Sequence, residues 1–318
     1  MNKELTKKLS SGHSTCAGCG IPAIVRTVLD EIKDPVVVAN ATGCLEVTST
    51  LYPYSAWKVP YIHNAFENAA ATISGVETAY RVLRKKGKIP GQARDGSTKR
   101  TKFVVFGGDG GTYDIGLQSL SGALERGHNF LYVCYDNQGY MNTGGQRSSA
   151  SPYGANTQTT PPSKIDIGNE IFCKDIMKIV SAHGIKYLAQ ANVAYLEDLR
   201  RKVKKALAVK GPSFLLVLQP CTNEWKFPSS QYVYYGKMAM ETNFWPLYEI
   251  EDGKYILNNE IKERKPIEDF LKGQGRFKHL FAPKNKKTIE RIQMMVDKKY
   301  GELKCLTGNK GCQCDLEK

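Results

Sequence analysis

The sequence lacks a long apolar run. No stretch of its 318 residues approaches the roughly 18 consecutive apolar residues that a membrane-spanning helix needs. The amino terminus carries charge but no apolar segment behind it, so we expect no secretory signal peptide and a cytoplasmic protein. Hydrophobic residues make up 41% and charged residues 24%, close to an average globular protein. We therefore expect a soluble, folded protein with no membrane partner.

Recognisable nucleic-acid-binding motifs are also missing, although the chain is basic. Lys and Arg number 45 against 31 Asp and Glu, a net charge of +14. Such a charge suits nucleic acid, a membrane surface or an acidic protein partner equally well. No helix-turn-helix, zinc-finger or RNA-binding signature accompanies the dispersed basic residues, which are typical of solvated helix faces. We expect no nucleic-acid partner.

Apolar runs alternate with segments of helical periodicity through most of the chain. The sequence predicts strands at 35–39, 102–106, 130–135, 186–189 and 213–218, and helices at 21–32, 66–86, 114–126, 171–183 and 193–209. This alternation is typical of a mostly parallel sheet with helices on both faces. Beyond about residue 236 the alternation weakens and the chain becomes polar and basic. We predict a doubly wound α/β domain over residues 1–235 and a C-terminal extension over residues 236–318.

Two of the predicted strands run directly into polar loops. The first is followed by Gly107-Gly108-Asp109-Gly110-Gly111, and the next by Asp136-Asn137-Gln138-Gly139. Right-handed crossovers bring both loops to one edge of a parallel sheet, where ligands bind. A carboxylate and an amide oxygen suit magnesium, and glycine backbone N–H groups let a diphosphate approach. The alternative is a glycine-rich turn with a solvated aspartate.

The spacing within these loops favours the first interpretation. Gly108-Asp109-Gly110 is followed by 26 residues and then by Asn137. This arrangement resembles the magnesium and diphosphate signature of thiamine diphosphate (ThDP) enzymes.

Nine cysteines form a second set of candidate ligands. An odd number in a cytoplasmic protein argues for metal or redox use rather than a disulfide framework. Cys16 and Cys19 precede a predicted helix, whereas Cys44 and Cys221 follow predicted strands. Four thiolates suit tetrahedral zinc or a 4Fe–4S cluster, and the spacing does not choose between them. A CxxC pair with two unrelated buried cysteines remains a third interpretation.

The other cysteines carry no such pattern. Cys134 falls in a predicted strand and Cys173 in a predicted helix, so we expect both to be small core residues. Cys305, Cys312 and Cys314 lie in the polar tail without a nearby fourth ligand. We leave their role unassigned and expect free thiols.

Long strings of the sequence resemble the ThDP-binding beta subunits of the 2-oxoacid:ferredoxin oxidoreductase family. The resemblance covers most of residues 10–300 and rests on the strings 12–20, 41–47, 63–70, 107–122, 135–146, 245–249 and 274–277. The string Phe66-Glu67-Asn68 is most similar to members that act on pyruvate, the pyruvate synthases. The resemblance implies a ThDP-binding fold and one 4Fe–4S cluster close to ThDP and Mg²⁺.

The resemblance also implies roles for particular residues. The matching cluster ligands are Cys16, Cys19, Cys44 and Cys221; the matching magnesium ligands are Asp109, Asn137 and the Gly139 carbonyl. Asn142 matches a catalytic asparagine near the thiazolium and substrate. The remaining positions expected to contact the cofactor are Gly43, Leu45, Glu46, Gly108, Gly110 and Gly111.

The reaction implied is oxidative decarboxylation of pyruvate, with coenzyme A taking the acyl group and electrons leaving through the cluster to ferredoxin. Sister subunits of the alpha, gamma and delta type are implied. The alpha subunit supplies the glutamate that activates ThDP, so we expect this chain alone to be inactive. The basic charge is then interpreted as a contact surface for acidic electron carriers or sister subunits.

Three other functions remain open. One is a relative acting on oxalate, 2-oxoisovalerate or an aryl glyoxylate. Another is a non-redox ThDP lyase with structural cysteines. The third is a zinc-stabilised interaction protein that does not bind ThDP.

Overall fold

The computed structural model describes residues 7–89 and 100–308. An eight-stranded sheet forms its centre, in the order β2-β1-β3-β4-β6-β5-β7-β8. The strands are β1 Val36–Ala41, β2 Tyr61–Asn64, β3 Lys102–Gly108, β4 Leu131–Asp136, β5 Tyr187–Asn192, β6 Ser213–Leu218, β7 Tyr248–Glu251 and β8 Lys254–Leu257. The first six strands are parallel, and β7 and β8 add an antiparallel edge.

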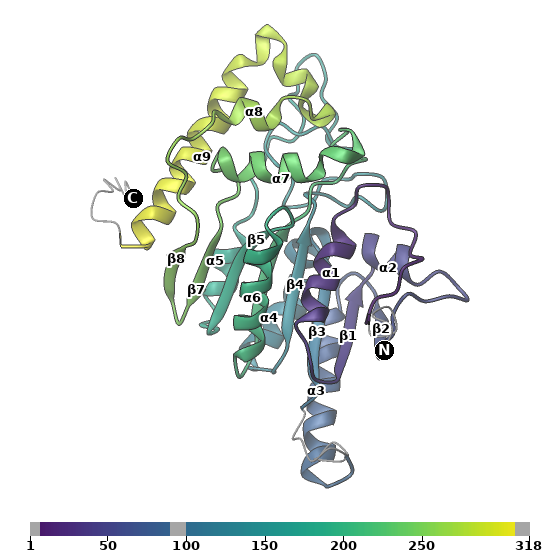
Figure 1. The fold of residues 1–318 in the computed structure, drawn as a ribbon. Helices are drawn as coiled ribbons and strands as arrows, with labels where there is room; N and C mark the ends of the chain where they lie inside the picture. The colour runs from purple at the N-terminus through teal and green to yellow at the C-terminus, as the bar shows by residue number, and fades with distance from the viewer. Residues whose placement is uncertain (1–6, 90–99, 309–318) are drawn as a thin grey trace.

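Helices cover both faces of this sheet, as the alternation predicts (Figure 1). The α-helices are α1 Ile21–Asp30, α2 Cys44–Ser49, α3 Ala69–Lys85, α4 Leu117–Glu125, α5 Ile176–Ser181, α6 Leu196–Ala208, α7 Tyr232–Glu241, α8 Ile267–Leu271 and α9 Lys286–Leu306. Short turns complete the set: a π-helix at Gly110–Asp114 and 3₁₀ turns at Ser229–Gln231, Gly275–Phe281 and Pro283–Asn285. The doubly wound α/β fold is confirmed.

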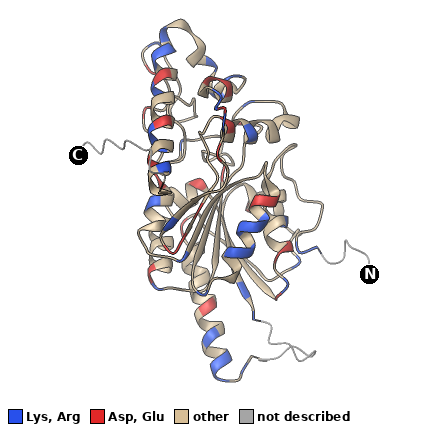
Figure 2. Ribbon diagram, turned by 60° about the vertical axis from the view of Figure 1, so that its left-hand side comes forward, with Lys and Arg blue, Asp and Glu red and all other residues tan. Residues whose placement is uncertain are grey.

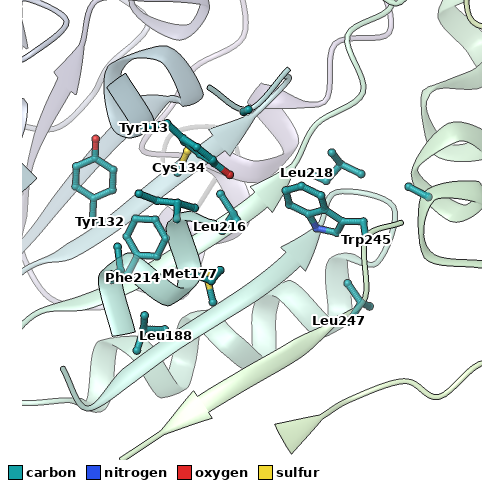
Figure 3. Close-up of a cluster of buried hydrophobic side chains, with 14 of the residues drawn as sticks. Tyr113, Tyr132, Cys134, Met177, Leu188, Phe214, Leu216, Leu218, Trp245 and Leu247 are labelled. Atoms are coloured by element: carbon teal, nitrogen blue, oxygen red, sulfur yellow. The ribbon is translucent and has the colours of Figure 1, made fainter. Parts of the chain in front are cut away.

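The alternation of side chains along each strand divides the core into two layers. Leu131, Val133 and Tyr135 of β4 pack with α1 and α6 on one face. Tyr132 and Cys134 of the same strand pack on the other face, with α3, α4 and α5. Figure 3 shows part of this second layer, where Cys134 lies among aromatic and aliphatic side chains. Cys134 is fully buried, so its prediction as a core residue is confirmed.

The central strands are buried on both faces and carry few charged residues. Most Lys, Arg, Asp and Glu residues lie on the helices around the sheet (Figure 2). Within the described residues no helix is long and apolar enough to cross a membrane. The segment after residue 236 contributes β7 and β8 to the same sheet, and α9 buries Ile292, Val296 and Leu303 against the core. The division into a domain and an extension at residue 235 stays a prediction.

One helix is shorter than its periodicity predicts, which corrects the position of Cys173. The Asp175 side chain accepts a hydrogen bond from the Lys178 backbone N–H and caps α5 at Ile176. Cys173 therefore lies in the extended stretch before the helix, where its thiol faces the carbonyls of Ala150 and Ser151.

Candidate functional site

The candidate site lies at the carboxyl edge of the parallel strands, where several loops meet. β1 leads into Gly43 and Cys44, β3 into Asp109, β4 into Asn137 and β6 into Cys221. Strand order reverses about β1, because β2 lies on one side of it and β3 on the other. Such a switch point is where open α/β sheets bind ligands.

Asp109 and Asn137 are in contact across neighbouring strands. The Asn137 backbone N–H donates to Asp109 Oδ1 at 3.2 Å, and the Ser148 hydroxyl donates to Asp109 Oδ2. The end of the Asn137 side-chain amide lies 2.8 Å from Asp109 Oδ1 and 3.0 Å from the Gly139 carbonyl oxygen. The structure thus brings together the three groups predicted to hold magnesium.

The Asn137 amide can present either of its ends to these two oxygens. With the nitrogen on that side, it donates to both. With Oδ1 toward these oxygens, the oxygens of Asn137, Asp109 and Gly139 lie next to one another. Asn137 Nδ2 then lies 4.0 Å from Cys44 Sγ. One side chain therefore joins the candidate magnesium ligands to a candidate cluster ligand.

Burial makes the carboxylates behind this site costly to ionise. It raises the pKa of Asp109 well above its usual range, and the neighbouring Asp136 carboxylate raises it further. Burial likewise raises the pKa of Asp136 to about 7, although hydrogen bonds from the Tyr113 hydroxyl and the Gln138 backbone N–H oppose the shift. The fully buried Asp109 thus favours a cationic ligand.

A small pocket opens between these loops. Its walls include seven of the predicted site residues: Gly43, Cys44, Gly108, Gly110, Gly111, Asn137 and Gly139. The exposed Asn142 lines it as well. A side chain at Gly110 would place its Cβ 2.3 Å from the Tyr140 ring, so only glycine fits there without a shift.

Sequence reasoning missed two tyrosines and a serine at this site. Tyr135 and Tyr140 line the pocket, and Ser148 binds Asp109 from the loop beyond it. The Tyr135 hydroxyl is buried and has no hydrogen-bond partner, whereas that of Tyr140 donates to the Gly110 carbonyl at 3.1 Å. The position of Tyr135 at the end of an apolar strand resembled that of an ordinary core residue.

Two predicted cofactor contacts lie behind the pocket rather than in its wall. Leu45 is fully buried in the core. The Glu46 carboxylate accepts a hydrogen bond from the Thr50 hydroxyl at 2.7 Å and lies 3.6 Å from His63 Nε2. Neither residue lines the pocket in this structure.

The four predicted cluster cysteines lie near one another, close enough for charge on Cys16, Cys19 and Cys221 to act on Cys44, although no three of them form a group that could hold a single metal ion. The loop that carries Cys16 and Cys19 packs against the segment after β6, where the Thr222 hydroxyl donates to the Ala17 carbonyl at 3.1 Å. Burial is the main cause that raises the pKa of Cys19 to about 12, and burial also raises the pKa of Cys44. Thiolates at the other cysteines raise both pKa values as well, so negative charge on one sulfur is felt by the rest.

The remaining cysteines lie elsewhere. Cys305 is disulfide-bonded, which corrects the expectation of a free thiol. Cys312 and Cys314 fall outside the described residues. Within residues 7–89 and 100–308, no three His, Cys, Asp or Glu side chains form a group that could hold a metal ion.

Comparisons with known proteins identify the family of the chain. Residues 41–217 match the thiamine pyrophosphate enzyme, C-terminal TPP binding domain family. The chain is 50% identical to "Pyruvate synthase subunit PorB" of Thermotoga maritima, over 95% of this chain and 93% of that protein. It is 44% identical to "Ketoisovalerate oxidoreductase subunit VorB" of Pyrococcus abyssi, over 93% and 92%.

A solved 2-oxoglutarate:ferredoxin oxidoreductase from Magnetococcus marinus shares the fold, with a TM-score of 0.54 and 24% identity over 69% of this chain and 68% of that one. That likeness concerns the fold alone. The family match and the full-length relatives are stronger evidence for the family, since they span the strand ends described above. The chain therefore belongs to the thiamine pyrophosphate enzymes, as a subunit of the beta type in the 2-oxoacid:ferredoxin oxidoreductase family.

Proposed function

We propose that this subunit binds ThDP, Mg²⁺ and one 4Fe–4S cluster and acts in the reversible, coenzyme A-dependent oxidative decarboxylation of pyruvate to acetyl-CoA and CO₂, with ferredoxin as electron acceptor. The single observation that carries the proposal is the position of the Asn137 amide. It lies 2.8 Å from Asp109 on one side and 4.0 Å from Cys44 Sγ on the other. A cofactor site and a thiolate site therefore adjoin each other.

The oxygens at Asp109, Asn137 and Gly139 fit a magnesium ion. Neighbouring ligands of an octahedral ion with bonds of about 2.1 Å lie about 3 Å apart. The separations of 2.8 and 3.0 Å match this value. A divalent cation would also offset the burial that makes the Asp109 carboxylate costly to ionise.

The pocket residues fit the organic part of the cofactor. The Tyr135 hydroxyl is a buried polar atom without a partner, and Gly110 leaves open a surface that any other residue would block. In this proposal the backbone at Gly108, Gly110 and Gly111 holds the diphosphate. Gly43, just before α2, and Leu45 and Glu46 within α2 support the cofactor. Asn142, exposed at the pocket wall, orients the substrate.

The donor chemistry of the four cysteines suits a redox cluster, although their side chains do not close on a single metal ion in this structure. Cys16, Cys19, Cys44 and Cys221 supply four thiolates, and the Asn223 side-chain N–H donates to the Cys16 sulfur, a contact typical of iron–sulfur centres. When bound, ThDP supplies an electron sink for loss of CO₂ and the cluster accepts electrons one at a time. This chain contributes the ligands, the glycine-lined pocket and a short path between the two sites.

The proposal needs other subunits. The relatives are named as subunits, and the chain belongs to a multi-subunit enzyme. We place the glutamate that activates ThDP on an alpha-type subunit and the onward electron path on gamma- and delta-type subunits. Residues 1–235 form the cofactor-binding domain in this proposal, and residues 236–318 are its extension.

Pyruvate is the substrate named for several relatives at 44–50% identity, but a relative named for ketoisovalerate is 44% identical as well. A substrate panel with the purified complex separates them. We expect acetyl-CoA formation and reduction of ferredoxin with pyruvate at rates at least tenfold above those with 2-oxoisovalerate, oxalate or phenylglyoxylate. A preference for 2-oxoisovalerate would move the assignment to the branched-chain enzymes.

A further inference from the structure

Asn223 touches two of the four candidate cluster cysteines. Its side-chain Nδ2 donates to Cys16 Sγ at 3.3 Å, across 207 residues of sequence. Its backbone N–H, together with that of Glu224, binds the Cys221 sulfur. The backbone N–H of Ile21 binds the Cys19 sulfur. Among these donors, the Asn223 side chain can be removed by substitution without changing the backbone.

The loop around Asn223 is held in place by its own contacts. The Thr222 hydroxyl donates to Ala17, between the two cysteines of the CxxC loop. At the next residue of that loop, a Cβ on Gly18 would lie only 2.1 Å from the Ser229 carbonyl oxygen. The segment after β6 therefore packs closely against the CxxC loop. This packing holds the Asn223 amide next to the Cys16 sulfur.

The hydrogen bond from Asn223 to Cys16 can be removed without changing the ThDP pocket. Both Cys16 and Asn223 are exposed to solvent, and neither lines the ThDP pocket. A substitution at Asn223 therefore alters the surroundings of one cluster ligand and leaves the magnesium ligands untouched.

We infer that Asn223 is a positioning residue that raises the reduction potential of the 4Fe–4S cluster through its hydrogen bond to Cys16 Sγ. The inference rests on the proposed function. An N–H donated to a ligand sulfur stabilises the extra negative charge of the reduced cluster. A carboxylate in the same place has the opposite effect, because it repels that charge.

The test compares the assembled complex, purified without oxygen, as wild type and as Asn223→Ala, Asn223→Asp and Asn223→Gln. The readout is the midpoint potential from a redox titration followed by electron paramagnetic resonance. The signal lost in a Cys221→Ala complex identifies the cluster of this subunit. We expect the potential to fall in Asn223→Ala, to fall further in Asn223→Asp and to stay near the wild-type value in Asn223→Gln.

Asn129→Ala is the matched control. Asn129 lies before β4, at the opposite end of the strands, and accepts a hydrogen bond from the Gly211 backbone N–H at 3.1 Å. Its removal should leave the potential unchanged.

Three results would overturn the inference. Equal potentials in wild type, Asn223→Ala and Asn223→Asp, at equal iron content, would show that the bond has no electronic effect. Loss of the cluster from both variants would make Asn223 an assembly residue instead. Wild-type complex without the signal that depends on Cys221 would remove the proposed function itself, which distinguishes that failure from the other two.

Discussion

Asn137 and Asp109, from the loops after two neighbouring strands, are joined by a hydrogen bond from the Asn137 backbone N–H to Asp109 Oδ1 at 3.2 Å. The side-chain amide of the same asparagine comes to 2.8 Å from that oxygen. Two residues separated by 28 positions thus form the base of one candidate cation site.

The Asp109→Asn substitution should weaken Mg²⁺-dependent ThDP binding by at least tenfold and leave the fold intact. Asparagine has nearly the same shape, but it removes the charged cation ligand. Because burial raises the pKa of Asp109, the charged form opposes folding, so the variant should unfold at the same temperature as wild type or higher. Calorimetric titration and a thermal melt measure the two effects.

Asp252→Asn, in the turn between β7 and β8, is the control for that experiment and should bind ThDP as wild type does. Unchanged ThDP affinity in Asp109→Asn would contradict the assignment of this carboxylate.

Single substitutions should sort the cysteines into two groups. Cys44→Ala and Cys221→Ala should lose most of the iron and acid-labile sulfide of this subunit, because each removes one of four ligands. Cys134→Ala and Cys173→Ala should retain both, since these thiols lie in the core and against the Ala150 carbonyl. Iron and sulfide assays on protein purified without oxygen decide the matter. Equal iron loss in all four variants would argue against a specific ligand set.

A methyl group at Gly110 should close the ThDP pocket. In Gly110→Ala the new Cβ would meet the Tyr140 ring at 2.3 Å, so the ring or the loop must move. We expect ThDP affinity to fall at least tenfold, as measured by fluorescence titration.

Gly75→Ala provides the contrast, because no atom lies within 4 Å of a Cβ added there, on helix α3. This variant should keep its ThDP affinity and gain about 0.5–1 kcal/mol of stability. ThDP affinity equal to that of wild type in Gly110→Ala would remove the pocket assignment.

The environment of Glu249 predicts that the free energy of unfolding falls at acid pH. Its side chain is buried and accepts hydrogen bonds from the Tyr187 hydroxyl at 2.7 Å, Lys205 at 2.8 Å and Asn258 at 2.6 Å. Burial alone would raise its pKa, but these bonds outweigh burial and lower the pKa to about 2. Since an unfolded glutamate titrates near pH 4.3, this stabilisation is complete above about pH 4.3 and is lost as the pH falls toward 2.

Glu249→Gln should therefore reduce the free energy of unfolding at pH 7 by about 1.5–3 kcal/mol, the usual value for a hydrogen bond to a charged group. The difference from wild type should shrink below pH 4. Urea unfolding at several pH values measures it, and a difference that stays constant from pH 7 to 3 would contradict this account.

Much of the fold could be predicted, because the central strands are buried on both faces and appear as apolar runs. Strand β6, at Ser213–Leu218, has the bounds that its apolar run predicts. Strands β2, β7 and β8 were missed: each has only four residues, and β2 and β8 are half exposed. Short, partly polar strands give little periodic signal.

The site was predictable where residues follow strand ends and unpredictable where a contact spans the chain. Asp109 and Asn137 come directly after strands, so topology alone places them together. The bond between Asn223 and Cys16 joins segments 207 residues apart, and no local pattern marks it. Cys173 was misplaced because the cap at Asp175 is a local hydrogen bond that outweighs apolar periodicity.

The most direct test of the central claim is the content of iron, acid-labile sulfide and thiamine in the complex purified without oxygen. The account predicts about four iron atoms and four sulfide ions in this subunit, together with bound ThDP. All four cysteines are then ligands of the cluster. Stoichiometric zinc without sulfide would contradict the electron-transfer role and leave at most a non-redox ThDP enzyme on the same fold.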